Sequence, residues 1–169
     1  MNSGRLKISP TPSPLDVGTT TVELEKGLDL SCADRIRLTL VVTASVNGGG
    51  AGDASDTIDC FLDSRDGSGL WEERARVPQV LASLTPTPTA PEVRVATVSQ
   101  GPLSGSEEAL EPSAPASTSL PTTGGVVNGH FPRNANASGL RAAAWRVRFL
   151  VTDADDDAQF EAYAFVEWS

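Results

Sequence analysis

An acidic run, TDADDDAQF over residues 152–160, is the densest group of side chains in this sequence that could do chemistry. Asp153, Asp155 and Asp157 have the 1-3-5 spacing of an EF-hand loop, whose carboxylate oxygens suit calcium. That loop also requires glycine at its sixth position and glutamate at its twelfth, where this chain has Ala158 and Ala164. The sequence therefore argues against an EF-hand and favours no metal, with a looser calcium site at the three aspartates left open.

Nucleophilic and zinc chemistry have few candidates. His130 is the only histidine, so a Ser-His-Asp or Cys-His arrangement must use it. It lies in NGHFPRN, an irregular stretch that offers a base no rigid support, and one histidine with two cysteines gives no zinc-ligand spacing. The Gly-rich stretch at 47–55 lacks the Gly-Lys-Ser/Thr of a phosphate loop. We therefore expect no enzyme and no cofactor.

Charge and cysteine content narrow the class further. The net charge of −9 argues against nucleic-acid binding, which needs a basic surface, and against an anionic membrane. The N-terminus lacks the apolar region of a signal peptide, and no run approaches the length of a membrane span. Cys32 and Cys60 are predicted to be reduced, buried thiols, with one disulfide as the alternative.

Alternating apolar and polar residues predict a chain built of strands. The clearest segments are 19–25, 28–31, 35–46, 56–64, 70–77, 92–99, 143–152 and 158–168. No βαβ spacing is present, and the interval between the cysteines lacks the tryptophan of an immunoglobulin domain. The predicted fold is all-β: an antiparallel, jelly-roll-like β-sandwich with long Pro/Ser/Thr/Gly-rich loops.

The last two predicted strands flank the acidic run. Trp145, Val147 and Phe149 share one face of the first strand, and Phe160 and Ala162 share one face of the second. Placing Thr152 opposite Gln159 aligns both apolar faces and leaves DADDDA as a six-residue loop. It also sets Arg146 and Arg148 beside Glu161, Tyr163 and Glu167, where opposite charges would pair. We therefore predict a hairpin with an acidic tip.

Three polar stretches interrupt this pattern, at 9–14, 84–92 and 101–139, and alternating prolines favour extended chain in them. We predict an extended N-terminal arm over 1–18, then one domain over 19–169 with a long irregular insertion at about 101–139. A polar stretch of that length has little of its own to bury, so a partner subunit is the expected means of ordering it.

A second hairpin is predicted where SRDGSGLW, residues 64–71, joins two strands. Ser64, Asp66 and Trp71 match the spacing of the Asp-box turn of sialidase-like propellers, with Gly69 displaced by one position and Leu70 in place of threonine. In that family the box is a structural turn. The stretch therefore supports a hairpin and carries no information about sialic acid.

The framework also resembles small β-sandwich virion proteins of tailed bacteriophages, many of which have a DxSxDGGxxW hairpin. The similarity rests on Asp63, Ser64, Asp66, Gly67, Gly69 and Trp71 and covers about half of the chain. The resemblance implies a non-enzymatic capsid decoration, or cement, protein on the capsid exterior, made in the bacterial host cytoplasm. Its implied partners are the major capsid protein and copies of itself, as a homotrimer.

Two alternatives stay open. One is a head–tail connector or tail protein of the same origin, for which six- or twelve-fold rings are expected. The other, from a different class, is a carbohydrate-binding β-sandwich that uses exposed aromatic residues and calcium.

Overall fold

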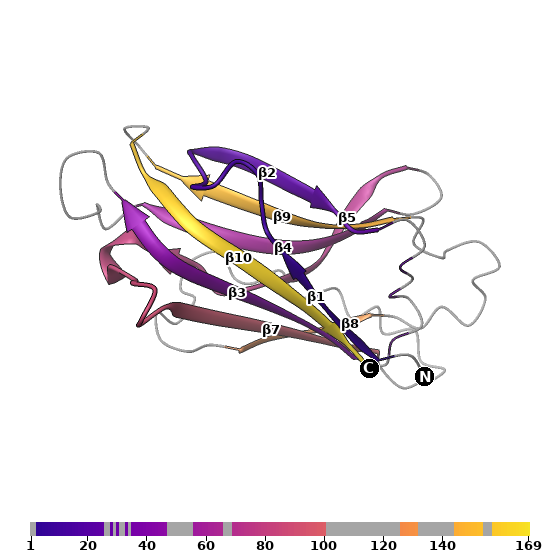
Figure 1. Ribbon diagram of the computed structural model, residues 1–169. Coiled ribbons are helices and arrows are strands. Elements are labelled where there is room, and N and C mark those ends of the chain that lie inside the picture. The colour runs from indigo at the N-terminus through magenta and orange to yellow at the C-terminus, as the bar shows by residue number, and fades with distance from the viewer. Residues whose placement is uncertain are drawn as a thin grey trace.

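Strands dominate the computed structural model, which describes residues 3–25, 28, 30, 33, 35–46, 56–65, 69–100, 126–131, 144–153 and 157–169 (Figure 1). The strands are β1 (Gly4–Ile8), β2 (Gly18–Glu23), β3 (Arg35–Val46), β4 (Thr57–Arg65), β5 (Trp71–Arg76), β6 (Val80–Leu81), β7 (Glu92–Gln100), β8 (Val126–Phe131), β9 (Ala144–Thr152) and β10 (Gln159–Trp168). A short 3-10 helix, η2, covers Ala82–Leu84. No helix in these ranges is long and apolar enough to cross a membrane.

The strands form two layers. Sheet A has the order β1-β10-β3-β7-β8, and sheet B has the order β2-β9-β4-β5, with β6 paired to β4. Figure 1 shows β10, β3 and β7 in one layer and β2, β9 and β4 in the other. All pairs are antiparallel except β7 with β8, which run parallel. The predicted all-β sandwich is thus confirmed.

The pairing follows the logic of a jelly roll, in which one long hairpin of four strand pairs is wrapped into two sheets. The outermost strands pair as β1 with β10, and the next pair is β2 with β9. The inner pairs are β3 with β7 and β4 with β5. Successive pairs alternate between sheets A and B, so the wrapped hairpin encloses one core.

The core lies between the inner faces of the two sheets. Ile36, Leu38, Leu40 and Val42 of β3 are fully buried, as their alternation predicts. From sheet B, Val147 and Phe149 are likewise fully buried. Each such side chain contributes roughly 1.5–3 kcal/mol on leaving water, so this continuous apolar layer is the main source of stability.

The predicted hairpin of β9 and β10 is wrong, because β9 pairs with β2 and β4 in sheet B whereas β10 pairs with β1 and β3 in sheet A. The apolar faces of the two strands do meet, but across the core and not side by side. The chain therefore crosses from sheet B to sheet A between β9 and β10. The predicted pairing of Arg146 and Arg148 with Glu161 and Glu167 fails with it.

Two stretches predicted to be irregular contain strands. Residues 4–8 of the predicted N-terminal arm form β1, because Leu6 and Ile8 pack on the core and the backbone pairs with β10. Residues 126–131 of the predicted insertion form β8 beside β7. The other residues of 101–139 lie outside the described ranges.

The hairpin of β4 and β5 forms as predicted, with a bulge between Leu62 and Asp63 in the register. In its turn, Gly69 has a φ of +86°, a conformation that side chains rarely adopt. Asp66 and Gly67 lie outside the described residues. Of the strand predicted at 28–31, the structure describes only residues 28 and 30, and neither of these two lies in a strand.

Candidate functional site

Three carboxylates gather at the crossover between β9 and β10. Because Thr57 of β4 lies opposite Thr152 of β9, Asp56 is brought next to Asp153. One oxygen from each of Asp56, Asp153 and Asp157 lies within 4.8 Å of the others. Asp153 and Asp157 belong to the looser calcium site that the sequence leaves open. The sequence does not single out Asp56, and Asp155 lies outside the described residues.

Part of this cluster has a structural task. Asp153 Oδ2 accepts hydrogen bonds from the backbone N–H groups of Asp157 and Ala158, both at 2.8 Å. The side chain thus fixes the backbone where the chain enters sheet A. Oxygen donors of this kind suit hard cations such as calcium, but calcium takes six to eight oxygen ligands. Three carboxylates, one of them bonded to the backbone, provide only part of such a set.

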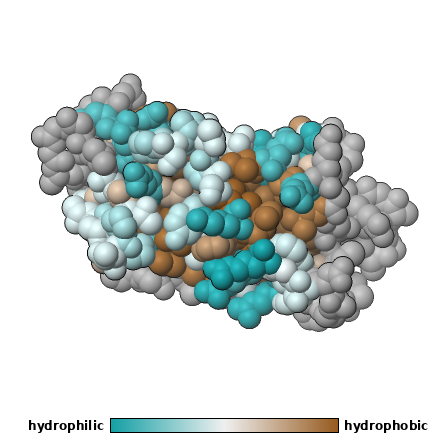
Figure 2. All heavy atoms as spheres, viewed as in Figure 1, coloured by the Kyte–Doolittle hydropathy of each residue, from teal (hydrophilic) through white to brown (hydrophobic). Residues whose placement is uncertain are grey.

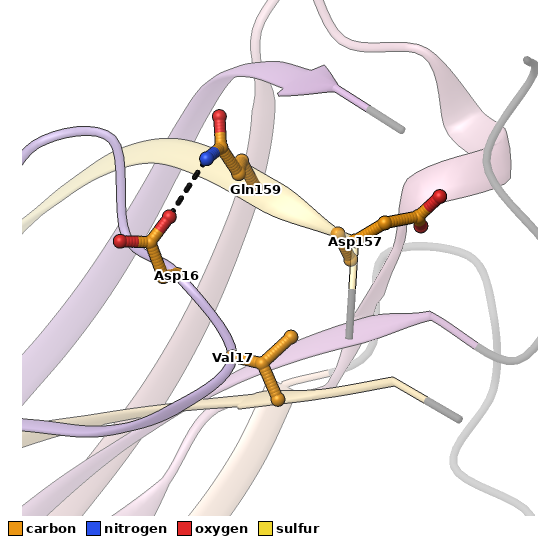
Figure 3. Close-up of a pocket in the computed structure, with 5 residues that line it drawn as sticks. Asp16, Val17, Asp157 and Gln159 are labelled. Atoms are coloured by element: carbon orange, nitrogen blue, oxygen red, sulfur yellow. Dashed lines mark hydrogen bonds between the residues drawn. The ribbon is translucent and has the colours of Figure 1, made fainter. Parts of the chain in front are cut away.

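An open depression lies beside the crossover, lined by Asp16, Val17, Asp157, Ala158 and Gln159. Gln159 Nε2 donates a hydrogen bond of 2.8 Å to Asp16 Oδ1. Figure 3 shows that the carboxylate of Asp157 points away from this pair. The polar groups of the depression therefore do not converge on one point, as a binding or catalytic site would require.

A larger polar network covers the outer face of sheet B. Asp63 of β4 is 2% exposed and lies between two arginines of β9. Its Oδ2 accepts hydrogen bonds from Arg146 Nε at 2.9 Å and from Arg148 Nε at 3.0 Å, and its Oδ1 accepts one from Arg148 Nη2 at 3.2 Å. The buried charge of Asp63 is therefore compensated by two guanidinium groups.

Asp59 is held in the same way, two residues along β4 from Phe61. Arg76 Nη2 donates to Asp59 Oδ1 at 2.7 Å, and Gln79 Nε2 donates to Oδ2 at 3.0 Å. The guanidinium carbons of Arg76 and Arg148 lie 5.1 and 3.9 Å from the ring centroid of Phe61. This outward-facing ring is only 4% exposed, so the arginines cover it.

The hairpin residues belong to this network. Arg74 Nε donates a 2.7 Å hydrogen bond to the hydroxyl of buried Ser64. The guanidinium carbons of Arg146 and Arg65 lie 4.2 and 5.3 Å from the ring centroid of Trp71. Arginines thus already occupy the aromatic surface of Trp71 that a sugar ring would stack on.

Titration behaviour follows from burial and from these pairs. Burial raises the pKa of Glu73 above its usual value, although Arg148 and Arg76 oppose the shift. Burial lowers the pKa of Arg148, but the hydrogen bond and charge of Asp63 outweigh this effect, so the pKa is raised overall. The Arg148 guanidinium therefore stays charged and pairs with the carboxylates of Asp63 and Glu73.

The thiol of Cys60 lies inside the core and is not in a disulfide. Burial raises its pKa far above the usual range, and the neighbouring charge of Asp59 adds to the shift. A thiol that stays protonated is a poor nucleophile. Cys32 lies outside the described residues, and the side chain of His130, in β8, is likewise not described.

Sequence reasoning missed the partners of Asp59 and Asp63. The core residues Ile58, Cys60 and Leu62 alternate with both acids along β4. This alternation places the acids together on the outer face of the strand, and it is visible in the sequence. The arginines at 146 and 148 were instead assigned to the wrong neighbour. The missing information was which strand lies beside β9.

No protein-family model matches this chain, and no curated protein matches it. Among solved structures it is similar to a chain in the structure of the Gt strain of infectious bursal disease virus, with a TM-score of 0.35 and 8% identity. That similarity covers 99% of this chain and 31% of the viral chain, so this chain spans about a third of its length.

Proposed function

We propose that this chain is a non-enzymatic structural protein of a tailed-bacteriophage virion, and within that class a capsid decoration protein. The observation that carries the proposal is the hairpin that resembles those of such proteins, set between β4 and β5 of a jelly roll. Jelly rolls are used by viral capsid proteins and by lectins, so the fold supports this reading by analogy only.

The polar groups of sheet B support a structural role. Asp59 and Asp63 are 2% exposed and neutralised by arginines, which leaves neither carboxylate available as a general base or nucleophile. The Cys60 thiol is enclosed in the core. Among the described residues, these two carboxylates thus link neighbouring strands and this thiol packs in the core.

Bridging of neighbouring capsid subunits is the proposed mechanism. Because β1 is paired with β10 in its own sheet, residues 4–8 do not serve as a free arm. We therefore assign the bridging to the outer surfaces of the sandwich. Contacts across a subunit boundary add interface area that resists separation of the shell, and the net charge of −9 keeps the protein soluble outside it.

The carbohydrate-binding alternative is disfavoured by the same surface, since arginines stack on Trp71. A glycan array with the full chain, in the presence and absence of a calcium chelator, tests it. Chelator-sensitive binding to defined glycans would replace the virion proposal.

Cryo-EM of the particle that contains this chain tests the leading proposal. We expect density for the jelly roll on the outer capsid surface, across boundaries between capsid subunits. Density in the tail, or in a six- or twelve-fold ring at the portal, would support the connector or tail alternative and contradict decoration. Absence of the chain from purified particles would contradict a virion role altogether.

A further inference from the structure

The outer face of sheet A is an unusual surface for a chain with net charge −9. We call it the sheet A face. Its side chains alternate with core residues along the strands, and they are Arg5 and Lys7 of β1, Glu161, Tyr163, Phe165 and Glu167 of β10, Arg37, Thr39 and Val41 of β3, and Val93 and Val95 of β7. In the view of Figure 1, where strands of both sheets are visible, the surface has an apolar area bordered by hydrophilic residues (Figure 2).

The middle of the sheet A face consists of two rows that run across three strands and are apolar except for Thr39. Tyr163, Val41 and Val93 lie side by side in the register, and so do Phe165, Thr39 and Val95. The rings of Tyr163 and Phe165 meet edge to face at 5.5 Å. Val93, at the edge of the rows, is 45% exposed, whereas Val41 and Thr39 in the middle are buried. Arg5 and Lys7 of β1 lie over the rings of Phe165 and Tyr163, at 3.8 and 4.2 Å from the ring centroids.

The two ends of the sheet A face carry opposite charges. At one end Arg5 and Arg37 flank Glu167, with Nε–Oε distances of 3.4 and 3.8 Å, and their own side chains are 57% and 50% exposed. At the other end the exposed Glu161 lies at the bulge of β10. The face as a whole has more cations than carboxylates, which reverses the sign of the chain's overall charge.

We propose that the sheet A face packs against the same face of a second copy of this chain, with the strands of the two copies running in opposite directions. Sheets pack face to face at about 10 Å with their strands roughly aligned. In the reversed arrangement the two apolar rows meet, and the arginine end of one copy lies over the Glu161 end of the other. This two-fold contact goes beyond the proposed function, which needs contacts with capsid subunits only.

Charge complementarity favours a second copy of this chain as the partner that covers the sheet A face. Two chains of net charge −9 repel each other over most of their surfaces. On the sheet A face the arginines reduce that repulsion, and each arginine end finds a carboxylate across the contact. An isologous contact of this kind closes at two copies, whereas the homotrimer that the resemblance implies needs a different contact on each partner.

Sedimentation equilibrium of the full chain, over a wide concentration range, measures this association. The Val93→Glu variant places a carboxylate among the apolar rows at a position exposed enough to preserve folding, which circular dichroism verifies. We expect the wild-type chain to form dimers and Val93→Glu to weaken them at least about tenfold. Leu70→Glu, at a 69% exposed position of the β4–β5 hairpin, is the matched control and should dimerise like the wild type.

A charge-reversal pair tests the orientation. Arg37→Glu and Glu161→Arg should each weaken the dimer, since each sets like charges opposite one another, and the double variant should recover most of the affinity. Glu23→Arg, on the outer face of sheet B, is the control for a change of net charge. A monomeric wild-type chain, a trimeric mass, unchanged association of Val93→Glu, or a double variant as weak as the singles would overturn the proposal.

Failure of this inference differs from failure of the proposed function, because the mass of the purified chain is measured without a particle. A chain that dimerises through the sheet A face but is absent from virions retains the contact and loses the virion role. A chain that decorates particles but stays monomeric in solution retains the virion role and loses the contact.

Discussion

The outer faces of the two sheets differ in how far their charged and apolar side chains are covered within one chain. On sheet B, buried carboxylates, arginines and aromatic rings form a closed layer in which Asp63 is 2% exposed. On sheet A, the corresponding layer is less closed: Val93 is 45% exposed, and the side chains of Arg5 and Arg37 are half exposed although Arg5 lies over the ring of Phe165. The sheet B network completes itself within one chain, whereas the sheet A face leaves apolar area and charge available to a partner.

The contrast indicates that ion pairs on the two faces of this domain contribute differently to its stability. On sheet B the buried carboxylate of Asp63 is shared by Arg146 and Arg148, so its loss removes the closest anionic partner of both cations. Arg5 and Arg37 on sheet A share Glu167, whose side chain is 32% exposed, and pairs accessible to water contribute little. Variants matched between the two faces test this distinction.

The largest difference is expected for Asp63→Ala. Removal of this carboxylate leaves Arg146 and Arg148 without their shared partner, and we expect the free energy of unfolding to fall by about 2–4 kcal/mol. Glu167→Ala, the matched change on sheet A, should cost less than about 1 kcal/mol. Urea denaturation followed by tryptophan fluorescence measures both. Equal losses would show that sheet B is no more closed than sheet A.

Gly4→Ala tests the edge of sheet A. Gly4 lies opposite Trp168 in the β1–β10 register, and a Cβ at position 4 would overlap the indole ring. Displacing that ring from the core edge should cost about 1–3 kcal/mol. In a Trp168→Leu background the same substitution should cost little. If it remains as costly there, the loss arises from the backbone and not from the ring.

Asp153→Ala tests the crossover that sends β9 and β10 to different sheets. The variant loses the acceptor for two backbone N–H groups, so we expect a thermal-denaturation loss of about 1–2 kcal/mol. Asp153→Asn keeps an acceptor oxygen and should lose less. A gain of stability in the alanine variant would show instead that repulsion among Asp56, Asp153 and Asp157 dominates.

The smallest effect concerns Glu73 at the rim of the sheet B network. Because its pKa is raised in the folded state, its favourable contribution is present below the unfolded pKa and is lost as pH rises through the folded pKa. Glu73→Gln should therefore gain stability relative to the wild type as pH rises through that range. The carboxylate is 41% exposed, so the gain should be only a few tenths of a kcal/mol. A relative loss on raising the pH would contradict the assigned direction.

Alternation along the sequence predicted which residues face the core, because side-chain period is a local property of a strand. It predicted the faces of β3, β9 and β10 and the β4–β5 hairpin. It could not predict the crossover, since apolar faces of two strands meet equally well side by side in one sheet or across the core. The wrong neighbour for β9 then hid the ion pairs of Asp63 with Arg146 and Arg148.

The acidic cluster shows the same limit. The 1-3-5 spacing identifies Asp153 and Asp157 as candidate calcium ligands. Asp56 joins them only through the pairing of Thr57 with Thr152. A contact between residues about a hundred positions apart depends on strand order, which a single sequence does not specify. Local chemistry was therefore predictable, and its assembly into networks was not.

Hydroxyl-radical footprinting of the full chain, at low and at high protein concentration, tests the difference between the two faces most directly. The account predicts that oxidation of Tyr163 and Phe165 on sheet A falls as concentration rises, while oxidation of Phe61 and Trp71 on sheet B stays unchanged. Protection of Phe61 and Trp71, or no protection of Tyr163 and Phe165 at any concentration, would contradict it.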